Sequence, residues 1–474
     1  MSRGHAPEAV TLSSIRRMCE GVIPATMCTV SDEGMPHLCY LSQVEYIDEA
    51  HVALSFQFFN RSRENILATR RCAVTVDDPY TAAGVRLQLL YLRTESSGPL
   101  FERMKAKLAG IATHSGMDKV YHLQGADIYE VQSVETIPGR RTLQAPQPRC
   151  DIRAGTRAVI ERISASQDMA TLLDETLLGL RDALRIDHAI ILLLDADRQC
   201  LYTIASLGYE RSGVGAEIPL GQGLAGLAAR EGTPLRIGHM TMWQTYARAI
   251  RQRSEDLGLD GALCHDIPLP GLAEPRSQLA VPLRLLGRVV GVLLVESTQD
   301  QHFSHDDEDA LVSVAAPLAL SLSLLQPHET ASAAAERPPE AASDTRAAPA
   351  PSEHTAPADH TRLVTVHHHP HTDSIFLDQD YLIKGVAGAI LWRLVNEWAQ
   401  QGRQDFSNRE LRMDPGLRLP DVTDNLEARL ILLQRRLAER AAPLQIVKTG
   451  RGRFRLEVAA TLALVQHLSE APPA

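Results

Sequence analysis

The spacing of apolar positions changes several times along the chain, and each change separates one group of predicted elements from the next. Between residues 23 and 134, short apolar runs bounded by turn residues are typical of β-strands. From residue 158 the apolar residues take helical spacing, and strand-like runs return between residues 189 and 296. A stretch without periodic apolar positions then precedes a last mixed region. These changes predict a multidomain α+β protein.

The first region, residues 8–140, contains predicted strands rich in Val, Leu, Tyr and Phe. Turns rich in Asp, Glu, Ser and Gly separate these runs, and two further runs, Ser62–Thr69 and Pro99–Thr113, predict helices. Many strands with few helices indicate a small β-barrel. The predicted strands are Ile23–Val30, Met35–Ile47, His51–Phe58, Cys72–Val76, Val85–Thr94 and Gly125–Val134.

The second region, residues 153–326, begins and ends with predicted helices. Apolar residues recur at helical spacing in 158–163 and 169–184, and again in the closing helix 306–325. The strands predicted between them are Ala189–Asp195, Leu201–Ser206, Gln278–Leu283 and Val289–Glu296. The following segment, 327–361, is rich in Ala, Pro, Glu and Ser, which predicts a flexible linker.

The third region, residues 362–459, ends in a long predicted helix and two short strands. Four leucines at helical spacing give the helix one apolar face. They are Leu426, Leu430, Leu433 and Leu437. The segment Thr449–Gly452 is predicted to turn between strands at 446–447 and 454–456. A helix followed by a basic hairpin is the layout of a winged helix.

Composition excludes several classes of protein. A chain of 474 residues exceeds one ordinary hydrophobic core, so two to four domains are expected. No apolar run approaches the roughly 20 residues of a membrane helix, and the first residues have no apolar core of a secretory signal. The 7 cysteines are scattered and never form C-x-x-C, which favours reduced thiols in the cytoplasm. The net charge of −10 argues against a chain that is basic all over.

The first region resembles the flavin-binding split barrel of the pyridoxamine 5′-phosphate oxidase-like superfamily. The resemblance rests on the order PATMCTVSDEGMPHLCYLS … HVALSFQFFNRSRENILATRRCAVTVDD. In that superfamily a basic, hydroxyl-bearing turn after the third strand holds the FMN phosphate, and guanidinium and hydroxyl groups suit this role. The matching residues here are Asn60, Arg61, Ser62, Arg63 and Asn65. Ser62 stands where a lysine is common. The resemblance implies FMN, with haem or deazaflavin as alternatives.

Residues for catalysis or metal binding are not evident in the sequence. Histidines 37, 114 and 122 are isolated, and no Ser/His/Asp or Cys/His pattern has a diagnostic spacing. The run His367–His371 is local, whereas a metal site needs converging ligands, so we predict none. We expect a protein without a catalytic residue. An FMN-dependent oxidoreductase with regulatory domains is the enzymatic alternative.

The second region resembles a GAF domain, a small-molecule sensor. The motifs IPLGQGLAGLAAREGTPLRI and SQLAVPLRLLGRVVGVLLVES occur in the family's order and spacing. The sequence GQGLAG fits the nucleotide-binding pattern GxGxxG, but its context predicts the GAF turn and helix start. The resemblance places the pocket beneath residues 239–274, and the closing helix is apolar enough for a homodimer contact. Candidate ligand contacts are Trp243, Tyr246, Cys264 and His265.

The third region resembles the OmpR/PhoB-type winged helix, which implies DNA binding. The matching motif is DNLEARLILLQRRLAE … IVKTGRGRFRL. Residues 362–458 hold 15 basic and 12 acidic side chains, so the region is only mildly basic. Candidate DNA contacts are Arg429, Arg435, Arg436, Arg451, Arg453 and Arg455. On the helix face that should meet DNA, Ile431 and Leu432 instead predict contact with protein, such as a second copy, the GAF domain or another factor.

Taken together, the three resemblances imply a cytoplasmic sensor-regulator. A small molecule would act through the barrel and the GAF domain, and the winged helix would bind DNA to regulate transcription. The alternative from another class is a signalling adaptor whose winged helix binds protein at Ile431 and Leu432. We expect no membrane association.

Overall fold

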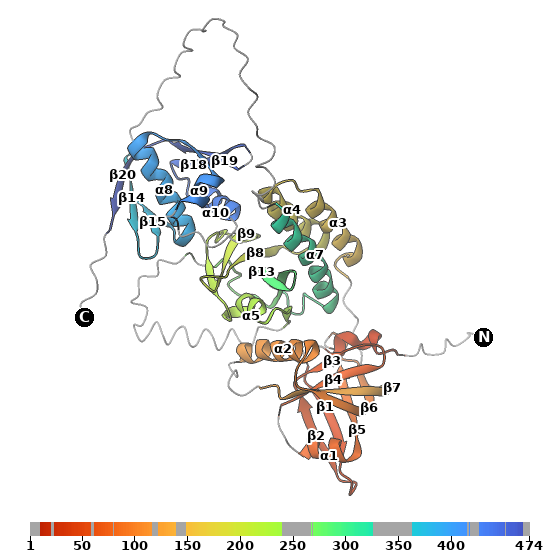
Figure 1. Ribbon diagram of the computed structural model, residues 1–474. Coiled ribbons are helices and arrows are strands. Elements are labelled where there is room, and N and C mark those ends of the chain that lie inside the picture. The colour runs from red at the N-terminus through yellow and green to blue at the C-terminus, as the bar shows by residue number, and fades with distance from the viewer. Residues whose placement is uncertain are drawn as a thin grey trace, which may run out of the picture.

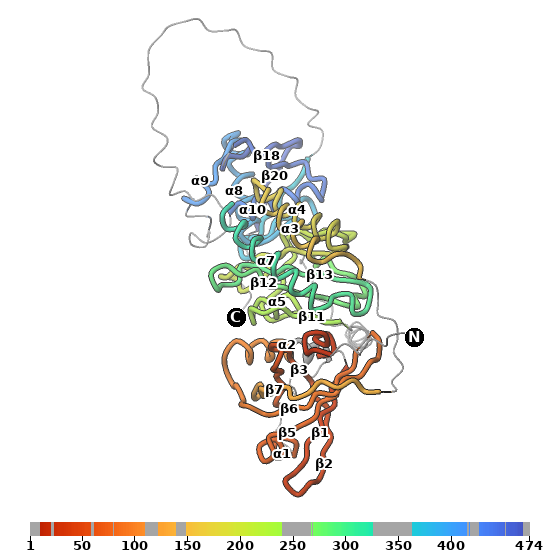
Figure 2. The backbone as a smooth tube through the Cα atoms, turned by 90° about the vertical axis from the view of Figure 1, so that its right-hand side faces the viewer, coloured from red at the N-terminus to blue at the C-terminus, as the bar shows by residue number. Residues whose placement is uncertain are grey.

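The protein folds into three packed units that follow one another along the molecule in chain order, as Figures 1 and 2 show. The computed structural model describes residues 10–19, 23–57, 61–78, 80–115, 122–138, 148–238, 267, 269–325, 363–414, 417, 426–450 and 452–467. Each unit has its own sheet, and the C-terminal unit has two. The predicted multidomain α+β class is confirmed in this coarse form. Among the described residues, no helix is long and apolar enough to cross a membrane.

The first unit is an antiparallel seven-stranded sheet in the order β2-β1-β5-β6-β7-β4-β3. Its strands are β1 (Ala25–Val30), β2 (Pro36–Leu41), β3 (Val44–Tyr46), β4 (His51–Phe56), β5 (Arg71–Asp77), β6 (Gly84–Glu95) and β7 (Gly125–Thr136). Its helices are the 3-10 helix η1 (Ser13–Cys19), α1 (Arg61–Thr69) and α2 (Pro99–Ser115).

The single strand predicted at Met35–Ile47 is two strands at opposite edges of this sheet. Only Ser42 and Gln43 separate β2 from β3. Because two residues span only about 7–10 Å, the sheet must curl until its edges approach each other. The curled sheet encloses a core that includes Val52, Val74 and Leu87.

The second unit is a six-stranded antiparallel sheet in the order β10-β9-β8-β13-β12-β11, with helices on both faces. The strands are β8 (His188–Asp195), β9 (Cys200–Leu207), β10 (Glu217–Pro219), β11 (Leu235–Ile237), β12 (Ser277–Leu285) and β13 (Arg288–Ser297). The helices are α3 (Ile152–Ala165), α4 (Met169–Leu184), α5 (Gly223–Glu231) and α7 (His305–Leu324).

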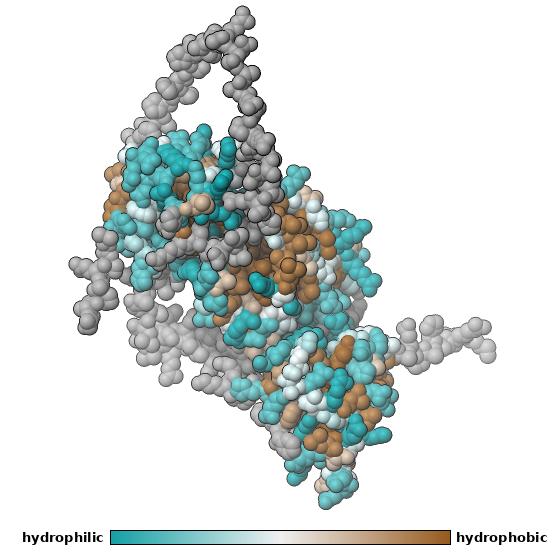
Figure 3. Space-filling view, in the orientation of Figure 1, coloured by the Kyte–Doolittle hydropathy of each residue, from teal (hydrophilic) through white to brown (hydrophobic). Residues whose placement is uncertain are grey.

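Alternation along the strands divides the core of the second unit between two layers. Ile191 and Leu193 of β8 face the layer of α3, α4 and α7, whereas Ile190 and Leu192 face α5. The GQGLAG segment forms the turn before α5 and the start of that helix, as predicted. Figure 3 shows apolar side chains gathered over this unit, where α7 exposes Val312, Leu320 and Leu324.

The C-terminal unit combines a four-stranded sheet, three helices and a three-stranded sheet. Its strands are β14 (Leu363–His369), β15 (Ser374–Leu377), β16 (Asp380–Ile383), β17 (Asp405–Ser407), β18 (Leu444–Gly450), β19 (Arg453–Val458) and β20 (Thr461–Gln466). Its helices are α8 (Gly385–Gln401), α9 (Asn408–Met413) and α10 (Leu426–Glu439). Strand β20 pairs in parallel with β14 and extends the unit past residue 459. Part of the histidine run lies in β14.

Both junctions between units are packed. Helix α2 of the first unit lies against α5, and Ala106 of α2 joins the apolar layer beneath α5 (Figure 1). Tyr80 donates a hydrogen bond from its hydroxyl to the carbonyl oxygen of Gln301 at 2.6 Å. At the other junction, one continuous cluster of buried apolar side chains runs from the second unit into the C-terminal unit. The C-terminal unit is therefore docked on the second unit.

Candidate functional site

The turn predicted to hold a flavin phosphate lies at the start of α1. Asn60 lies outside the described residues, and Arg61 is exposed. Ser62 and Asn65 are buried, with their side chains bonded inside the barrel. The Ser62 hydroxyl donates to the sulfur of Cys39 at 3.2 Å, and Asn65 Nδ2 donates to a threonine hydroxyl of β1 at 3.0 Å. These two side chains therefore do not face a surface phosphate.

Arg63, the other predicted phosphate ligand, forms a buried ion pair with Asp127. Its Nη2 also donates to the Thr94 hydroxyl at 2.8 Å, and its guanidinium lies 4.4 Å from the centroid of the Phe56 ring. Burial raises the pKa of Asp127, while the Thr94 and Arg63 contacts oppose this rise. Removing Arg63 from this network would leave a carboxylate buried without its cation. In this arrangement the guanidinium stabilises the barrel.

A cavity of about 100 Å³ lies beside this network, and Cys39, Ser62 and Arg63 are among its lining residues. The Ser55 hydroxyl and the Gln57 Oε1 have no hydrogen-bond partner among the described residues. The volume is well below the roughly 300–1,000 Å³ of typical small-molecule pockets. Neither the cavity nor the buried side chains of the turn fit FMN inside one chain. FMN, haem or deazaflavin binding by the barrel stays a prediction.

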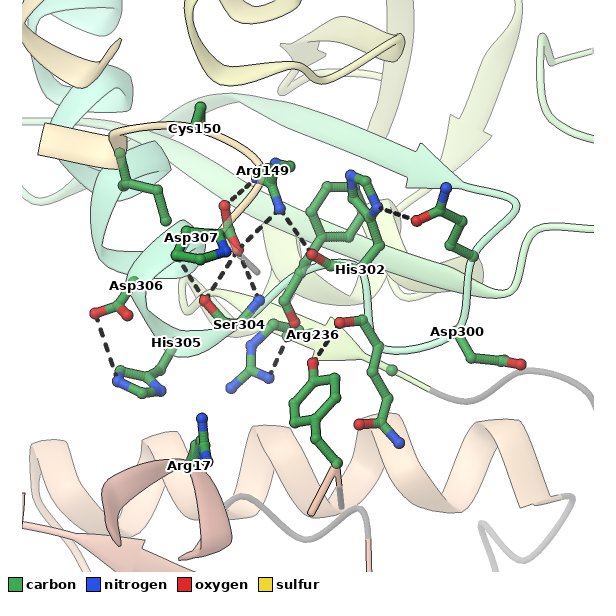
Figure 4. Close-up of a pocket in the computed structure, with 17 residues that line it drawn as sticks. Arg17, Arg149, Cys150, Arg236, Asp300, His302, Ser304, His305, Asp306 and Asp307 are labelled. Atoms are coloured by element: carbon green, nitrogen blue, oxygen red, sulfur yellow. Dashed lines mark hydrogen bonds and ion pairs between the residues drawn. The ribbon is translucent and has the colours of Figure 1, made fainter. Parts of the chain in front are cut away.

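A larger cavity, about 360 Å³, lies where the first and second units meet (Figure 4). Arg149 enters it from the segment before α3 and pairs with Asp307 in the first turn of α7. The same guanidinium donates to the backbone oxygens of Leu184 at 3.0 Å and His302 at 2.8 Å. Arg149 therefore ties three segments of the second unit together.

Charges around this junction cavity nearly balance. Its lining includes three arginines and three aspartates, so it presents no strong field for a ligand of either sign. Burial lowers the pKa of His302, and the Arg149 charge adds to that effect. Burial likewise lowers the pKa of His305. The lowered pKa of both histidines favours the neutral imidazole at pH 7.

A buried carboxylate, Glu296, lies near the end of β13 in the second unit. Tyr209 donates to its Oε2 from the phenol at 3.0 Å, and the backbone N–H of Leu272 donates to the same oxygen at 3.0 Å. Gln278 Nε2 donates to the other oxygen. Burial raises the pKa of Tyr209, and the Glu296 charge raises it further. Glu296 thus anchors the chain entering β12 to the sheet.

Helix α10, predicted to enter a DNA groove, lies against the second unit. Ala428, Ile431 and Leu432 are buried. Arg429 donates from Nη2 to Asp195 Oδ2 at 2.6 Å, and the two side chains are only 4% and 3% exposed. Ile431 and Leu432 belong to the apolar cluster that the second and C-terminal units share, and contact with a protein partner stays a prediction.

The Arg429 guanidinium also lies 4.1 Å from the ring centroid of Tyr202 in β9. This position suits a cation–π contact beneath the ion pair. In the docked arrangement, a DNA phosphate therefore cannot reach Arg429.

The other predicted arginines of α10 differ in their surroundings. Arg435 donates to Asp174 of α4 at 2.7 Å, with side chains 23% and 59% exposed. Arg436 is buried within the C-terminal unit, where it donates to the Leu382 carbonyl at 2.9 Å and to Glu439 at 2.7 Å. Because these contacts belong to its own unit, Arg436 is a structural residue in this arrangement.

The predicted basic hairpin is formed by β18 and β19. Arg451 lies outside the described residues. Exposed and buried side chains alternate along β19. Arg453 and Arg455 are exposed, and Phe454 and Leu456 are buried. Arg455 forms two hydrogen bonds to Asp405, at 2.9 and 3.0 Å, in the neighbouring strand β17. The predicted alternation of arginines along β19 is therefore present.

Comparison with known families identifies one of the three units. Residues 168–322 match the family model of the GAF domain. This part of the chain is a GAF domain. A search of curated proteins found no match.

Three solved structures similar to part of the chain are each matched over most of their own length. The GAF domain of a phosphoenolpyruvate-protein phosphotransferase from Acinetobacter is 25% identical, over 36% of this chain and 92% of its own, with a TM-score of 0.29. Free methionine-R-sulfoxide reductase from Neisseria meningitidis is 20% identical, over 39% of this chain and 95% of its own, with a TM-score of 0.29. An FMN-binding protein from Syntrophomonas wolfei is 17% identical, over 27% of this chain and 88% of its own, with a TM-score of 0.24.

The candidate ligand contacts of the GAF domain, Trp243, Tyr246, Cys264 and His265, lie outside the described residues. They stay predictions. The described part of the domain contains the buried and hydrogen-bonded Glu296, which the sequence did not predict. A glutamate that follows an unbroken apolar strand, as in VVGVLLVES, is the signal that could have identified it, because such a residue is buried only with hydrogen-bond partners.

The docking residues of the GAF domain were also missed. Asp174, Asp195 and Tyr202 lie on three different elements, and they form one surface only because α10 packs across them. From the local sequence alone, Asp174 is predicted to be a solvated helix residue, Asp195 a turn residue and Tyr202 a strand residue. Contacts between domains have no local sequence signal.

Proposed function

We propose that this chain is a ligand-responsive regulator whose GAF domain controls the output of the C-terminal unit. In this proposal a small molecule binds the GAF domain, and the C-terminal unit is a winged helix that binds DNA. The barrel serves as a second input or as a structural module. The GAF domain supports the sensing of a small molecule. The winged-helix fold, the binding of DNA and the regulation of transcription are parts of the proposal.

The observation that carries the proposal is the direct docking of the GAF domain on α10. Apolar side chains of both parts form one buried cluster, and the buried pair Arg429–Asp195 lies within the contact. A ligand changes an equilibrium only through states for which it has different affinity. Because the α10 contact includes β8 and β9 of the GAF sheet, a rearrangement of that sheet on ligand binding would change the contact. The coupling therefore needs no additional domain.

Two features of the C-terminal unit favour a winged helix. Helix α10 is followed by the hairpin β18–β19, as the sequence predicts, and the helices α8 and α9 precede it. Arg453 and Arg455 project from the exposed side of β19, where cationic side chains can contact phosphates. Phe406 and Phe454 stack with ring centroids 5.9 Å apart and fix β19 to β17.

The Glu296 site points to the chemical class of the GAF ligand. Its carboxylate accepts hydrogen bonds from Tyr209, Gln278 and the N–H of Leu272. Leu272 lies within the segment 239–274, beneath which the GAF resemblance predicts the ligand pocket. A ligand carrying an amine or amide donor could replace the Leu272 N–H on Glu296. We expect such a ligand to release or reorder the chain that enters β12.

The adaptor alternative rests on Ile431 and Leu432, which suggested a protein partner. Both side chains are buried in the apolar cluster that the GAF domain and the C-terminal unit share, and this burial accounts for their apolar character within one chain. The homodimer stays a prediction, for which the exposed Val312, Leu320 and Leu324 of α7 are the relevant surface.

DNA binding by the full chain tests the proposed function. Fragmented genomic DNA is incubated with the chain at low salt, bound fragments are recovered, and their affinity is measured across a salt series. We expect binding that weakens as salt rises, because released counterions drive phosphate contacts. Replacement of Arg453 with Gln should reduce the affinity, whereas Arg181→Gln on the GAF helix α4 should not. Absence of salt-sensitive binding by any variant would contradict the DNA-binding output.

A further inference from the structure

Two of the three arginines of α10 that are predicted to bind DNA are held by carboxylates of the GAF domain. Arg429 pairs with Asp195, and Arg435 pairs with Asp174. We propose that this acidic face of the GAF domain acts as an internal competitor for nucleic-acid phosphate. It docks on α10 and occupies the two arginines until the domains separate. The inference rests on the proposed function, and it names the surface through which that function is regulated.

The pair at the centre of the contact cannot be shared with DNA. Asp195 uses both carboxylate oxygens, because Oδ1 accepts from the backbone N–H of Arg198 at 3.0 Å and Oδ2 accepts from Arg429 at 2.6 Å. The Arg429 guanidinium also lies over the Tyr202 ring, 4.1 Å from its centroid. A phosphate would have to take the place of Asp195, since both anions accept guanidinium N–H bonds in the same way. Docking and phosphate binding at Arg429 are therefore mutually exclusive.

The ion pair at the edge of the contact is weaker, and its arginine can exchange one partner for another. The Asp174 side chain is 59% exposed, so water competes for the pair with Arg435. Two further polar contacts lie around the edge. Lys384 of the C-terminal unit lies 3.3 Å from Glu217 of the GAF domain, and Glu439 accepts from the backbone N–H of Ser212 at 3.2 Å. Separation thus begins at exposed pairs and ends with one buried pair.

Neither hairpin arginine pairs with Asp195 or Asp174: Arg455 bonds to Asp405 of its own unit, and Arg453 borders a cavity between α10 and the start of α4. Arg453 and Arg455 remain exposed while α10 is docked. The docked chain should therefore touch DNA only through the hairpin, and the separated chain through the hairpin and α10 together. Each additional phosphate contact steepens the dependence of log affinity on log salt by about 0.9. Two released arginines predict a change in slope of about 1.8.

The test compares the full chain with the double variant Asp195→Asn/Asp174→Asn. Asparagine at 195 keeps an acceptor for the Arg198 N–H but removes the charge that holds Arg429. Affinity for a random-sequence DNA duplex is measured by fluorescence anisotropy across a salt series. Small-angle X-ray scattering of the same samples reports whether the domains separate. The matched control is Asp182→Asn/Glu161→Gln, which removes two GAF carboxylates outside the contact with α10.

We expect the double variant to expand, to bind DNA at least tenfold more tightly at low salt, and to show the steeper slope. The control should keep the slope of the unmodified chain. Equal slopes for the chain and the double variant would overturn the competition while leaving DNA binding intact. Expansion without DNA binding in any variant would instead remove the proposed output, and the competition with it. If Asp195→Asn impairs folding, Asp174→Asn alone should steepen the slope by about 0.9, and no change would overturn the proposal.

Discussion

Arg429 of α10 and Asp195 of the GAF domain form an ion pair in which both side chains are almost completely buried. The two residues are 234 positions apart in the chain. A buried pair contributes little net stability when intact, because desolvation offsets much of the attraction. Its loss on one side is costly, however, since a charge then remains buried without its partner. This asymmetry makes the pair suitable for holding two domains in one position.

Asp195→Ala should weaken the docking of the two domains by about 3–5 kcal/mol, because the docked state would then bury the Arg429 charge without its carboxylate. Chemical denaturation measures the change. The double variant Asp195→Ala/Arg429→Met should recover part of the loss. Asp197→Ala, at an exposed position of the same turn, should change stability by less than about 0.5 kcal/mol. Equal losses at the two aspartates would contradict the role of the pair.

Tyr209→Phe should destabilise the GAF domain by about 1.5–3 kcal/mol, since it removes a hydrogen bond to the buried Glu296 carboxylate. Thermal unfolding of the variant would show the change. Tyr40→Phe is the matched control, because Tyr40 is 80% exposed in the barrel. If Tyr209→Phe left the stability unchanged, the Glu296 carboxylate would have to obtain its hydrogen bonds from other groups.

Stability should decrease as pH falls below about 6.5. His302 and His305 have a pKa below 6.5 in the folded protein, chiefly through burial. As pH falls, the unfolded chain therefore binds protons before the folded chain does, and the free energy of unfolding drops. The stability that the two neutral histidines contribute is fully present above pH 6.5. Unfolding midpoints between pH 8 and 5 measure the trend, which His302→Gln should flatten and His371→Gln, at an exposed position, should leave unchanged.

Arg63→Ala should destabilise the barrel strongly, by about 3–5 kcal/mol, because Asp127 is left buried without its cation. Arg61→Ala, which changes an exposed residue of the same turn, should have little effect. Denaturation with and without added FMN separates structural from ligand roles. If FMN stabilised the unmodified chain and Arg61→Ala abolished that gain, the turn would hold a phosphate after all.

Local patterns of the sequence were sufficient to predict most elements. The leucine spacing predicted α10, and the GQGLAG segment predicted the start of α5. The two-strand split of Met35–Ile47 was missed because Ser42 and Gln43 carry no turn signal. Strand β20 was missed because its partner β14 lies about 100 residues earlier, and parallel pairing over that distance leaves no local pattern.

The candidate sites show the same limit more clearly. Periodicity predicted that Ile431 and Leu432 meet protein, because an apolar position on a helix needs burial wherever it lies. It could not predict which protein. The partners Asp195, Tyr202 and Asp174 are ordinary residues until tertiary packing places them under α10. Arg63 was predicted as a phosphate ligand from the family resemblance of its turn, and its ion pair with Asp127, 64 residues away, has no local sequence pattern.

The most direct test of this account is the salt dependence of DNA binding by the full chain and by Asp195→Asn/Asp174→Asn. The account predicts weaker, less salt-sensitive binding by the docked chain, and a slope about 1.8 steeper for the double variant. Indistinguishable affinities and slopes, in samples whose scattering shows that the variant has opened, would contradict it.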